Sequence, residues 1–206
     1  MQLVANIRRY KGYAAAPALS ASKTIRNFSD WNDVYPGYKD YTGDTQARNH
    51  AGTPAEPAII YTNNTGRNDF DVLKVARDMG NIYFYAKTVA NVTSNSGNNW
   101  MRLYIDIDRN AATGWKGYDY RVVGGNRLQY YRGGSWKNKQ TLKYSVSGNQ
   151  MMITVPRSYL NKLPEPLNLE FKWSDNMQRE NDVMDFWVNG DVAPAGRSNF
   201  HYKTIR

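Results

Sequence analysis

From Lys23 onward, apolar and polar residues alternate along most of the chain, over stretches of about five to nine residues. Successive side chains of a strand point to opposite faces, so this period of two indicates strands with one buried face. Turn-forming residues separate the stretches, as at 78–81 and 147–150. The clearest strands are predicted at 70–77, 82–88, 101–108, 118–123, 128–132, 141–147, 151–155, 167–173 and 183–188. The chain is therefore predicted to fold mainly as sheet.

About nine or ten short strands joined by tight turns favour an all-β fold, an antiparallel β-sandwich. One short helix is predicted over 157–163, between Pro156 and Pro164. The segment 30–57 has three prolines and little apolar periodicity. We expect it to be an ordered surface loop with one short strand, serving either a function or as a strap over a sheet edge.

The N-terminus has a different pattern. Leu3, Val4 and Ile7 recur at helical spacing and Gly12 follows, which predicts an amphipathic helix over 1–11. A helix of about eleven residues is marginal in water unless it packs on something. It is either the end of a preceding domain or a helix docked on this one. We divide the chain into a helix and linker, 1–22, and a sandwich domain, 23–206, which is expected to fold without the first segment.

The composition excludes several classes of active site. The 206 residues include no cysteine and two histidines, His50 and His201. Cysteine-ligated zinc, iron–sulfur clusters and thiolate nucleophiles are therefore excluded, and the two histidines lack the spacing of a zinc protease. No serine lies in a G-x-S-x-G turn. No apolar run is long enough for a membrane span. We predict neither an enzyme nor a membrane protein.

The net charge of +9 is regional, because the stretch 120–164 has eight basic residues and no acidic one. These residues are Arg121, Arg127, Arg132, Lys137, Lys139, Lys143, Arg157 and Lys162. They occur singly at alternating strand positions, and no aromatic nucleic-acid motif accompanies them. The pattern favours a solvated basic sheet face or an acidic partner, and nucleic acid is not predicted as a partner.

Two acidic residues, Asp106 and Asp108, end one of the predicted strands. Their side chains share a face, with Cα atoms about 6.6 Å apart. Three roles remain open. The pair could act as acid and base in a glycosidase, which needs a deep cleft. The spacing Asp106-x-Asp108-x-Asn110 matches the first ligands of a calcium loop, although Ala111 replaces the turn glycine and no closing Glu follows. The third role is a turn in which the side chains accept backbone N–H groups.

Four motifs make the chain resemble a known family: Asn-Phe-Ser-Asp-Trp at 27–31, the strand 81–87, the stretch 99–106 and Thr-Gly-Trp at 113–115. Over about 23–206 the chain resembles the family 9-type carbohydrate-binding modules and related dopamine-monooxygenase-like sandwich domains. The N-terminal helix is similar to the last helix of a glycosidase barrel that carries such a domain at its C-terminus.

The resemblance implies a site in which tryptophans stack on pyranose rings, often beside a structural calcium. Trp100 lies near the first stacking tryptophan of the family, and Arg102 lies where the family has an acidic sugar-binding residue. The second tryptophan is missing from the C-terminal loop, 190–199. The glycine-flanked Trp115 and Trp136 are candidates for a second exposed ring.

Other positions complete the predicted site. Asp119 and Arg102 are expected to supply polar contacts, and the polar loop 175–182 either contributes hydrogen bonds to sugar hydroxyls or is a plain hairpin loop. Trp31, Trp173 and Trp187 lie in motifs or apolar runs and are predicted to be core residues.

The sequence thus predicts a non-catalytic, monomeric accessory domain of a secreted glycoside hydrolase, located outside the cell, in the periplasm or on the cell surface. Its partners would be carbohydrate and the catalytic domain of the same polypeptide. No cofactor is required, and calcium at Asp106, Asp108 and Asn110 is the one considered. The alternative is a domain that braces the catalytic barrel without binding sugar.

Overall fold

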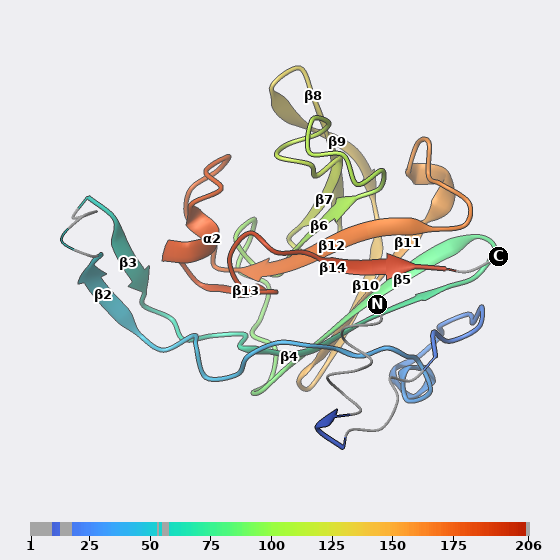
Figure 1. The fold of residues 1–206 in the computed structure, drawn as a ribbon, viewed down its shortest axis with the longest axis horizontal. Helices are drawn as coiled ribbons and strands as arrows, with labels where there is room; N and C mark the ends of the chain where they lie inside the picture. Colours follow the sequence, from blue (N-terminus) through green and yellow to red (C-terminus); the bar gives the residue numbers. More distant parts are fainter. Residues whose placement is uncertain (1–9, 13–17, 53, 55–57, 205–206) are drawn as a thin grey trace.

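The computed structural model describes residues 10–12, 18–52, 54 and 58–204. Two antiparallel sheets pack face to face (Figure 1). The first has the strand order β1 (Tyr38–Lys39), β4 (Phe70–Arg77), β5 (Asn81–Thr88), β11 (Gln150–Pro156), β10 (Lys143–Ser147). The second has the order β13 (Asp191–Ala193), β12 (Asn168–Asp175), β6 (Arg102–Asp106), β7 (Tyr120–Val123), β8 (Arg127–Arg132), β9 (Ser135–Thr141), and β14 (Phe200–Lys203) also pairs with β12. The predicted all-β sandwich is confirmed.

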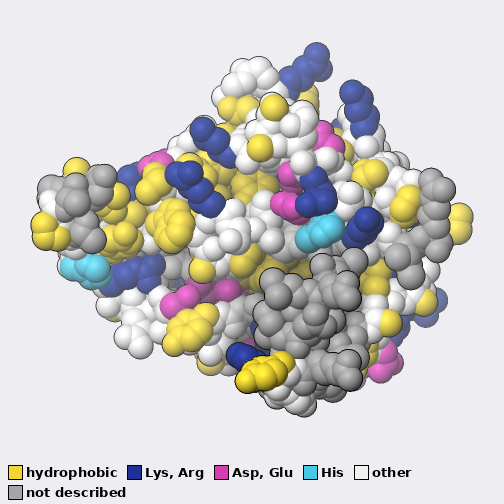
Figure 2. All heavy atoms as spheres, viewed as in Figure 1, with side chains coloured by type: hydrophobic (Ala, Val, Ile, Leu, Met, Phe, Trp, Pro, Cys, Tyr) yellow, Lys and Arg dark blue, Asp and Glu magenta, His cyan; other side chains and the backbone are white. Residues whose placement is uncertain are grey.

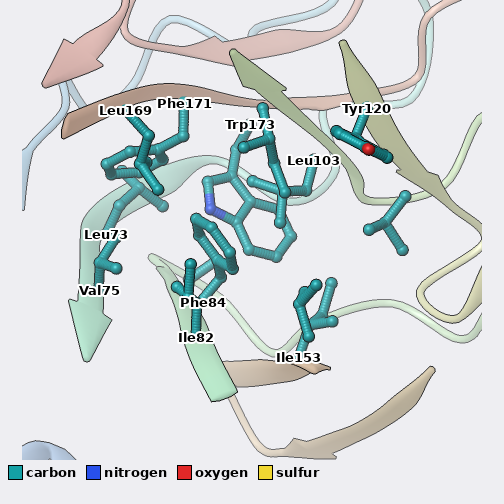
Figure 3. Close-up of a cluster of buried hydrophobic side chains, with 14 of the residues drawn as sticks. Leu73, Val75, Ile82, Phe84, Leu103, Tyr120, Ile153, Leu169, Phe171 and Trp173 are labelled. Atoms are coloured by element: carbon teal, nitrogen blue, oxygen red, sulfur yellow. The ribbon is translucent and has the colours of Figure 1, made fainter. Parts of the chain in front are cut away.

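The core lies between the two sheets and follows the period of two. Figure 3 shows the Trp173 indole at its centre, with Phe84 of β5 and Leu103 of β6 against it. All three side chains are fully buried. Burying a side chain of this size contributes about 1.5–3 kcal/mol, so the alternating apolar residues account for the pairing of these faces. Trp31 and Trp173 are core residues as predicted.

Two secondary-structure predictions were wrong, and several strands were not predicted. The segment 183–188 is not a strand but ends in a one-turn helix, α2 (Asp185–Val188), and its Trp187 is exposed. The predicted helix 157–163 is reduced to a single 3-10 turn, η2 (Arg157–Tyr159), because Leu160 leaves it in an extended conformation and is buried. Strand β9 was not predicted, since its residues are almost all polar and have no apolar alternation.

A second layer covers the outer face of the second sheet. There Tyr104 of β6 packs with Trp115, Tyr118 and Phe186, which come from the loop after β6 and from α2. This layer buries side chains that point away from the central core. It also fixes α2 on the sheet, close to one end of the molecule.

The segment 30–57 contains the predicted strand and one more, β1 and β2 (Arg48–Ala51). Strand β2 pairs with β3 (Ile60–Asn63) to form a small separate hairpin, which stands beside α2 at one end of the molecule (Figure 1). Thr62 bridges to Asn189 through the backbone and donates its hydroxyl to the Asn189 side-chain oxygen at 3.0 Å. Arg48 donates to the carbonyl of Gly190 at 3.0 Å. The hairpin is therefore anchored to the residues that follow α2.

Most of the predicted N-terminal helix lies outside the described residues. The described end of the predicted linker, 18–22, packs on the sandwich. Leu19 contacts the core, and Ser20 exchanges hydrogen bonds with Tyr35 through its backbone N–H and its hydroxyl. Arg77 of β4 donates to the Ser20 carbonyl at 3.0 Å. These residues belong structurally to the sandwich.

We compare a chain that lacks residues 1–22 with one that lacks residues 1–17. We expect the shorter chain to have a free energy of unfolding lower by about 2–4 kcal/mol, because it loses these hydrogen bonds and the Leu19 contact. Urea denaturation of the two truncated chains measures the difference. Equal stability would mean that 18–22 contributes nothing to the fold.

Candidate functional site

The structure buries Trp100, which was predicted to stack on sugar. Only 1% of its surface is exposed, and its ring packs against Tyr144 with centroids 5.9 Å apart. Its indole N–H donates to the Thr93 carbonyl at 3.0 Å. A cleft of about 500 Å³ lies above it, between 92–95 and 144–146, but the ring offers no open face to that cleft. The assignment of Trp100 as a stacking platform is corrected: the ring is part of the core.

The two other predicted platforms belong to the second layer. Trp115 is 6% exposed and packs against Tyr104 at 5.8 Å, so its predicted exposure was wrong. Trp136 is half-buried, and the Arg121 guanidinium lies over its ring, 4.6 Å from the centroid. Trp115 therefore has no open face for a pyranose, and one face of Trp136 is occupied by the Arg121 guanidinium.

Arg102, the predicted sugar-binding residue, is also buried. Its guanidinium forms an ion pair with Glu180 and donates to the Asn98 carbonyl at 2.7 Å. Arg121 binds the other Glu180 carboxylate oxygen at 2.6 Å. One half-exposed carboxylate therefore forms ion pairs with two buried guanidinium groups and ties the loop after β12 to the sheet.

The predicted acidic loop gathers three carboxylates. Asp106, Asp108 and Asp119 each place an oxygen within 4.8 Å of the others. Asp106 Oδ1 accepts the backbone N–H of Arg109 at 2.6 Å, and Asp119 Oδ2 accepts that of Ile107 at 3.0 Å. The sequence placed Asp119 among the sugar contacts, and the structure places it here instead.

Asn110, the third predicted metal ligand, accepts the backbone N–H of Ala112 at 3.0 Å through its side-chain oxygen. The Thr113 hydroxyl donates to Asp108 at 3.1 Å. These bonds are those expected of the turn role. A set of three carboxylates also suits a hard cation such as calcium, and a Cβ at Gly117 would approach Asp106 Oδ2 at 3.3 Å, so the glycine keeps this oxygen uncrowded.

Burial dominates the electrostatics of this loop. The pKa of Asp106 is raised to about 6, chiefly by burial and to a smaller extent by the neighbouring carboxylates Asp119 and Asp108, against the effect of backbone hydrogen bonds. Burial also raises the pKa of Asp119. Three carboxylates held this close repel one another, and a divalent cation would remove that repulsion.

Trp187 presents an exposed indole ring at the surface. All six tryptophans lie in described segments, and Trp187 alone is exposed, at 47%. One face of its indole rests on Gly196, where an added Cβ would lie 2.6 Å from ring carbons. Gly196 has φ +64°, which also favours glycine. Figure 2 shows hydrophobic side chains gathered over α2 and the β2–β3 hairpin. The indole is thus held in place from one side and open on the other.

The fully buried Asp185 shapes the segment that presents Trp187. Its Oδ2 accepts the backbone N–H groups of Gln178 at 2.7 Å and Arg179 at 3.0 Å, and its Oδ1 accepts from the Asn189 side chain. The polar loop is therefore folded back on the turn of α2. Sequence reasoning missed Trp187, although Asp182, which accepts the Met184 N–H at 2.9 Å, is the kind of residue that begins a helix.

Two clefts flank the point where the hairpin meets this segment. One, of about 480 Å³, is lined by Ala58, Ile60, Thr62, Asn64, Gln178, Arg179 and Asn189. The other, of about 210 Å³, is lined by Asp44, Arg48, Tyr61, Phe186, Trp187, Gly190, Asp191, Val192, Ala195 and Gly196. Both combine small apolar surfaces with planar amide, guanidinium or carboxylate groups. The polar loop 175–182 therefore does contribute side chains to a cleft.

A second group of carboxylates lies at the base of the smaller cleft. Asp44, Asp69 and Asp191 place oxygens within 4.8 Å of one another, so these residues could also hold a cation. Burial raises the pKa of Asp191 well above its usual range. It also lowers the pKa of the buried Lys172 to about 7, against the favourable charges of Asp40 and Asp191. Asp191 and Lys172 are buried, whereas Asp44 and Asp69 are half-buried.

No protein-family model, curated protein or solved structure matches the chain. The resemblance to family 9-type modules therefore stays a prediction based on the sequence motifs. Within the described residues, no helix combines the length and apolar character needed to cross a membrane.

The Asp106 loop can be tested for calcium with Asp106→Asn. Because its pKa is raised, the folded state holds the Asp106 proton more tightly than the unfolded state, and this group's contribution to stability falls as pH rises from about 4 to about 6. In EDTA at about pH 8 we expect the variant to be as stable as the wild type or more stable, by about 1–2 kcal/mol. Excess calcium should raise the melting temperature of the wild type only.

Calorimetry at about pH 4 and at about pH 8 measures these effects. The matched control is Asp33→Asn, because the Asp33 side chain is exposed. A calcium shift of equal size in wild type and Asp106→Asn would contradict a site in this loop, and no shift in either would leave the turn role alone.

Proposed function

We propose that the domain is a non-catalytic accessory domain that binds carbohydrate, with the open face of Trp187 as the platform for a pyranose ring. The observation that carries this proposal is the indole itself, which packs on Gly196, is about half exposed and lines the smaller cleft. The apolar C–H face of a sugar matches an exposed indole, while its hydroxyls need planar hydrogen-bonding side chains nearby.

Stacking alone gives weak binding. Covering about 100 Å² of apolar surface contributes roughly 2–3 kcal/mol, before the loss of translational freedom and the desolvation of hydroxyls. In this proposal, side chains that line the two clefts supply the remaining binding free energy. Asn64, Gln178 and Arg179 line the larger cleft, and Tyr61 and Arg48 line the smaller one beside Trp187. Sugar hydroxyls placed over these groups would add orientation and specificity.

The accessory role includes the proposed link to a catalytic domain of the same polypeptide, a glycoside hydrolase acting outside the cell, in the periplasm or on the cell surface. Asp106 and Asp108 accept backbone N–H groups in their turn, which supports a structural rather than an acid–base role. We assign calcium, where bound, to Asp106, Asp108 and Asp119, as a clamp on the loop that carries Trp115. The bracing role remains the competing function.

Replacing Trp187 by Ala should weaken binding of any recognised glycan by more than about tenfold, since the stacking contribution is lost. Isothermal titration of plant, host and bacterial glycans measures this. Tyr35→Ala is the matched control, because Tyr35 is also an exposed aromatic residue, at 44%, and does not line either cleft.

Gly196→Ala keeps the indole but moves it, because the added Cβ would overlap the ring. We expect it to weaken binding as well, and acrylamide quenching of tryptophan fluorescence should report a changed exposure of Trp187. If no glycan binds the wild type, or if Trp187→Ala binds as tightly, the site is wrong and the bracing function becomes the better account.

A further inference from the structure

A second surface, which we call the basic face, lies on the β8–β9 hairpin. Arg132 stands opposite Ser135, and Lys137 stands opposite Tyr130, so the side chains of Arg132 and Lys137 share one side of the hairpin. Lys139 lies where the pairing of β8 with β9 shifts register. Its ammonium lies 5.5 Å from the Tyr130 ring centroid, which places it on the same side of the hairpin.

Lys162 is an exposed cation outside the sheet, in the turn that meets the base of the hairpin. Asn161, which precedes Lys162 in the chain, accepts a hydrogen bond from the Lys139 ammonium at 3.4 Å. This contact brings the turn after η2 against the base of the hairpin. Figure 1 shows the tip of this hairpin projecting beyond the two sheets, and Figure 2 shows Lys and Arg side chains standing out at the same end.

These four cations lack acidic partners. Among the described residues, none of them lies within 4.0 Å of a carboxylate, whereas the neighbouring Arg157 is paired with Glu165. The sequence between 120 and 164 contains no acidic residue at all. The positive potential of this face is therefore not neutralised locally.

Protection of a sheet edge explains only part of this pattern. Strand β9 is the edge of its sheet, and lysines on an edge strand prevent pairing with other chains. Arg132, however, lies on the inner strand β8, and Lys162 lies on no strand. Arg132 therefore adds a cation to the side of the hairpin that carries Lys137, and Lys162 adds another near its base, which edge protection does not require.

We propose that the basic face binds an acidic polysaccharide, a carboxylated or sulfated glycan with charges repeated along an extended chain. Lys137 and Lys139, two residues apart along β9, can meet successive charges of such a chain. Nucleic acid fits less well, because single strands bind by stacking bases on open aromatic rings. Here one face of the Tyr130 ring already carries Lys139, one face of the Trp136 ring carries Arg121, and both rings are half-buried. This site is separate from the Trp187 platform and does not depend on it.

The test compares two triple variants with the same net charge, lowered from +9 to +6 by three Lys→Gln changes. The first changes the basic face: Lys137→Gln, Lys139→Gln and Lys162→Gln. The second changes three exposed lysines elsewhere: Lys11→Gln, Lys116→Gln and Lys203→Gln. The probes are polygalacturonate for carboxylates, dextran sulfate for sulfates and unmodified dextran as the neutral reference, at about 50 mM salt.

We expect the wild type to bind at least one acidic probe and not dextran, with affinity falling steeply as salt rises to about 200 mM. The basic-face variant should bind about tenfold more weakly, whereas the control variant changes by less than about threefold. Trp187→Ala should leave this binding unchanged, which separates it from the proposed neutral-sugar site. Melting temperatures of both triple variants check that each is folded.

Several results would overturn the proposal. Equal weakening of the two variants would mean that only the overall charge matters. Binding of single-stranded or duplex DNA as tight as that of the acidic glycan would assign the face to nucleic acid or to unselective attraction. Failure of the wild type to bind either acidic probe at about 50 mM salt would remove the site altogether.

Discussion

The buried carboxylate of Asp185 is the interaction on which the surface of this domain depends. It accepts two backbone N–H groups of the polar loop and the side chain of Asn189, which in turn holds the β2–β3 hairpin through Thr62. Removing a buried carboxylate of this kind would leave several donors without partners, at about 1–3 kcal/mol for each. The loop, α2 and the hairpin are thus organised from one group, and Trp187 and both clefts follow from their placement.

The sandwich was predictable because the period of two directly reflects which side chains enter the core. Phe84, Leu103 and Trp173 could be assigned to the interior from alternation alone. Strand β9 could not, since an edge strand with polar residues on both faces has no such signal. The segment 183–188 was wrongly predicted as a strand for a different reason. Its short apolar run is compatible with either a strand or a buried turn of helix, and only the contacts of Asp185 decide between the two.

The candidate site was less predictable than the fold because alternation does not reveal a second covering layer. Arg102 and Trp115 lie on or near the outer face of a sheet, a position that indicates exposure when nothing packs above it. Here the loop after β12 and α2 pack above it, and Glu180 provides the charge that lets Arg102 and Arg121 be buried. The layer that contains Trp115 and Trp136 also carries Trp187, which is exposed, on α2. The polar chemistry of 175–182 was visible in the sequence, but its meeting with 58–64 is a long-range contact that no local pattern encodes.

The two proposed surfaces differ in the force that would hold a ligand. An indole face and amide groups bind through apolar burial and short hydrogen bonds, which salt hardly affects, whereas unpaired lysines act through screened charges over about 8–10 Å. A glycan carrying both neutral and acidic residues could in principle engage both. Binding at two sites on one chain multiplies affinity only if the ligand spans the distance between them. Because the basic face lies on the β8–β9 hairpin and Trp187 lies beside the β2–β3 hairpin, joint binding would select long polymers over short oligosaccharides, even if each single site were weak (Figure 1).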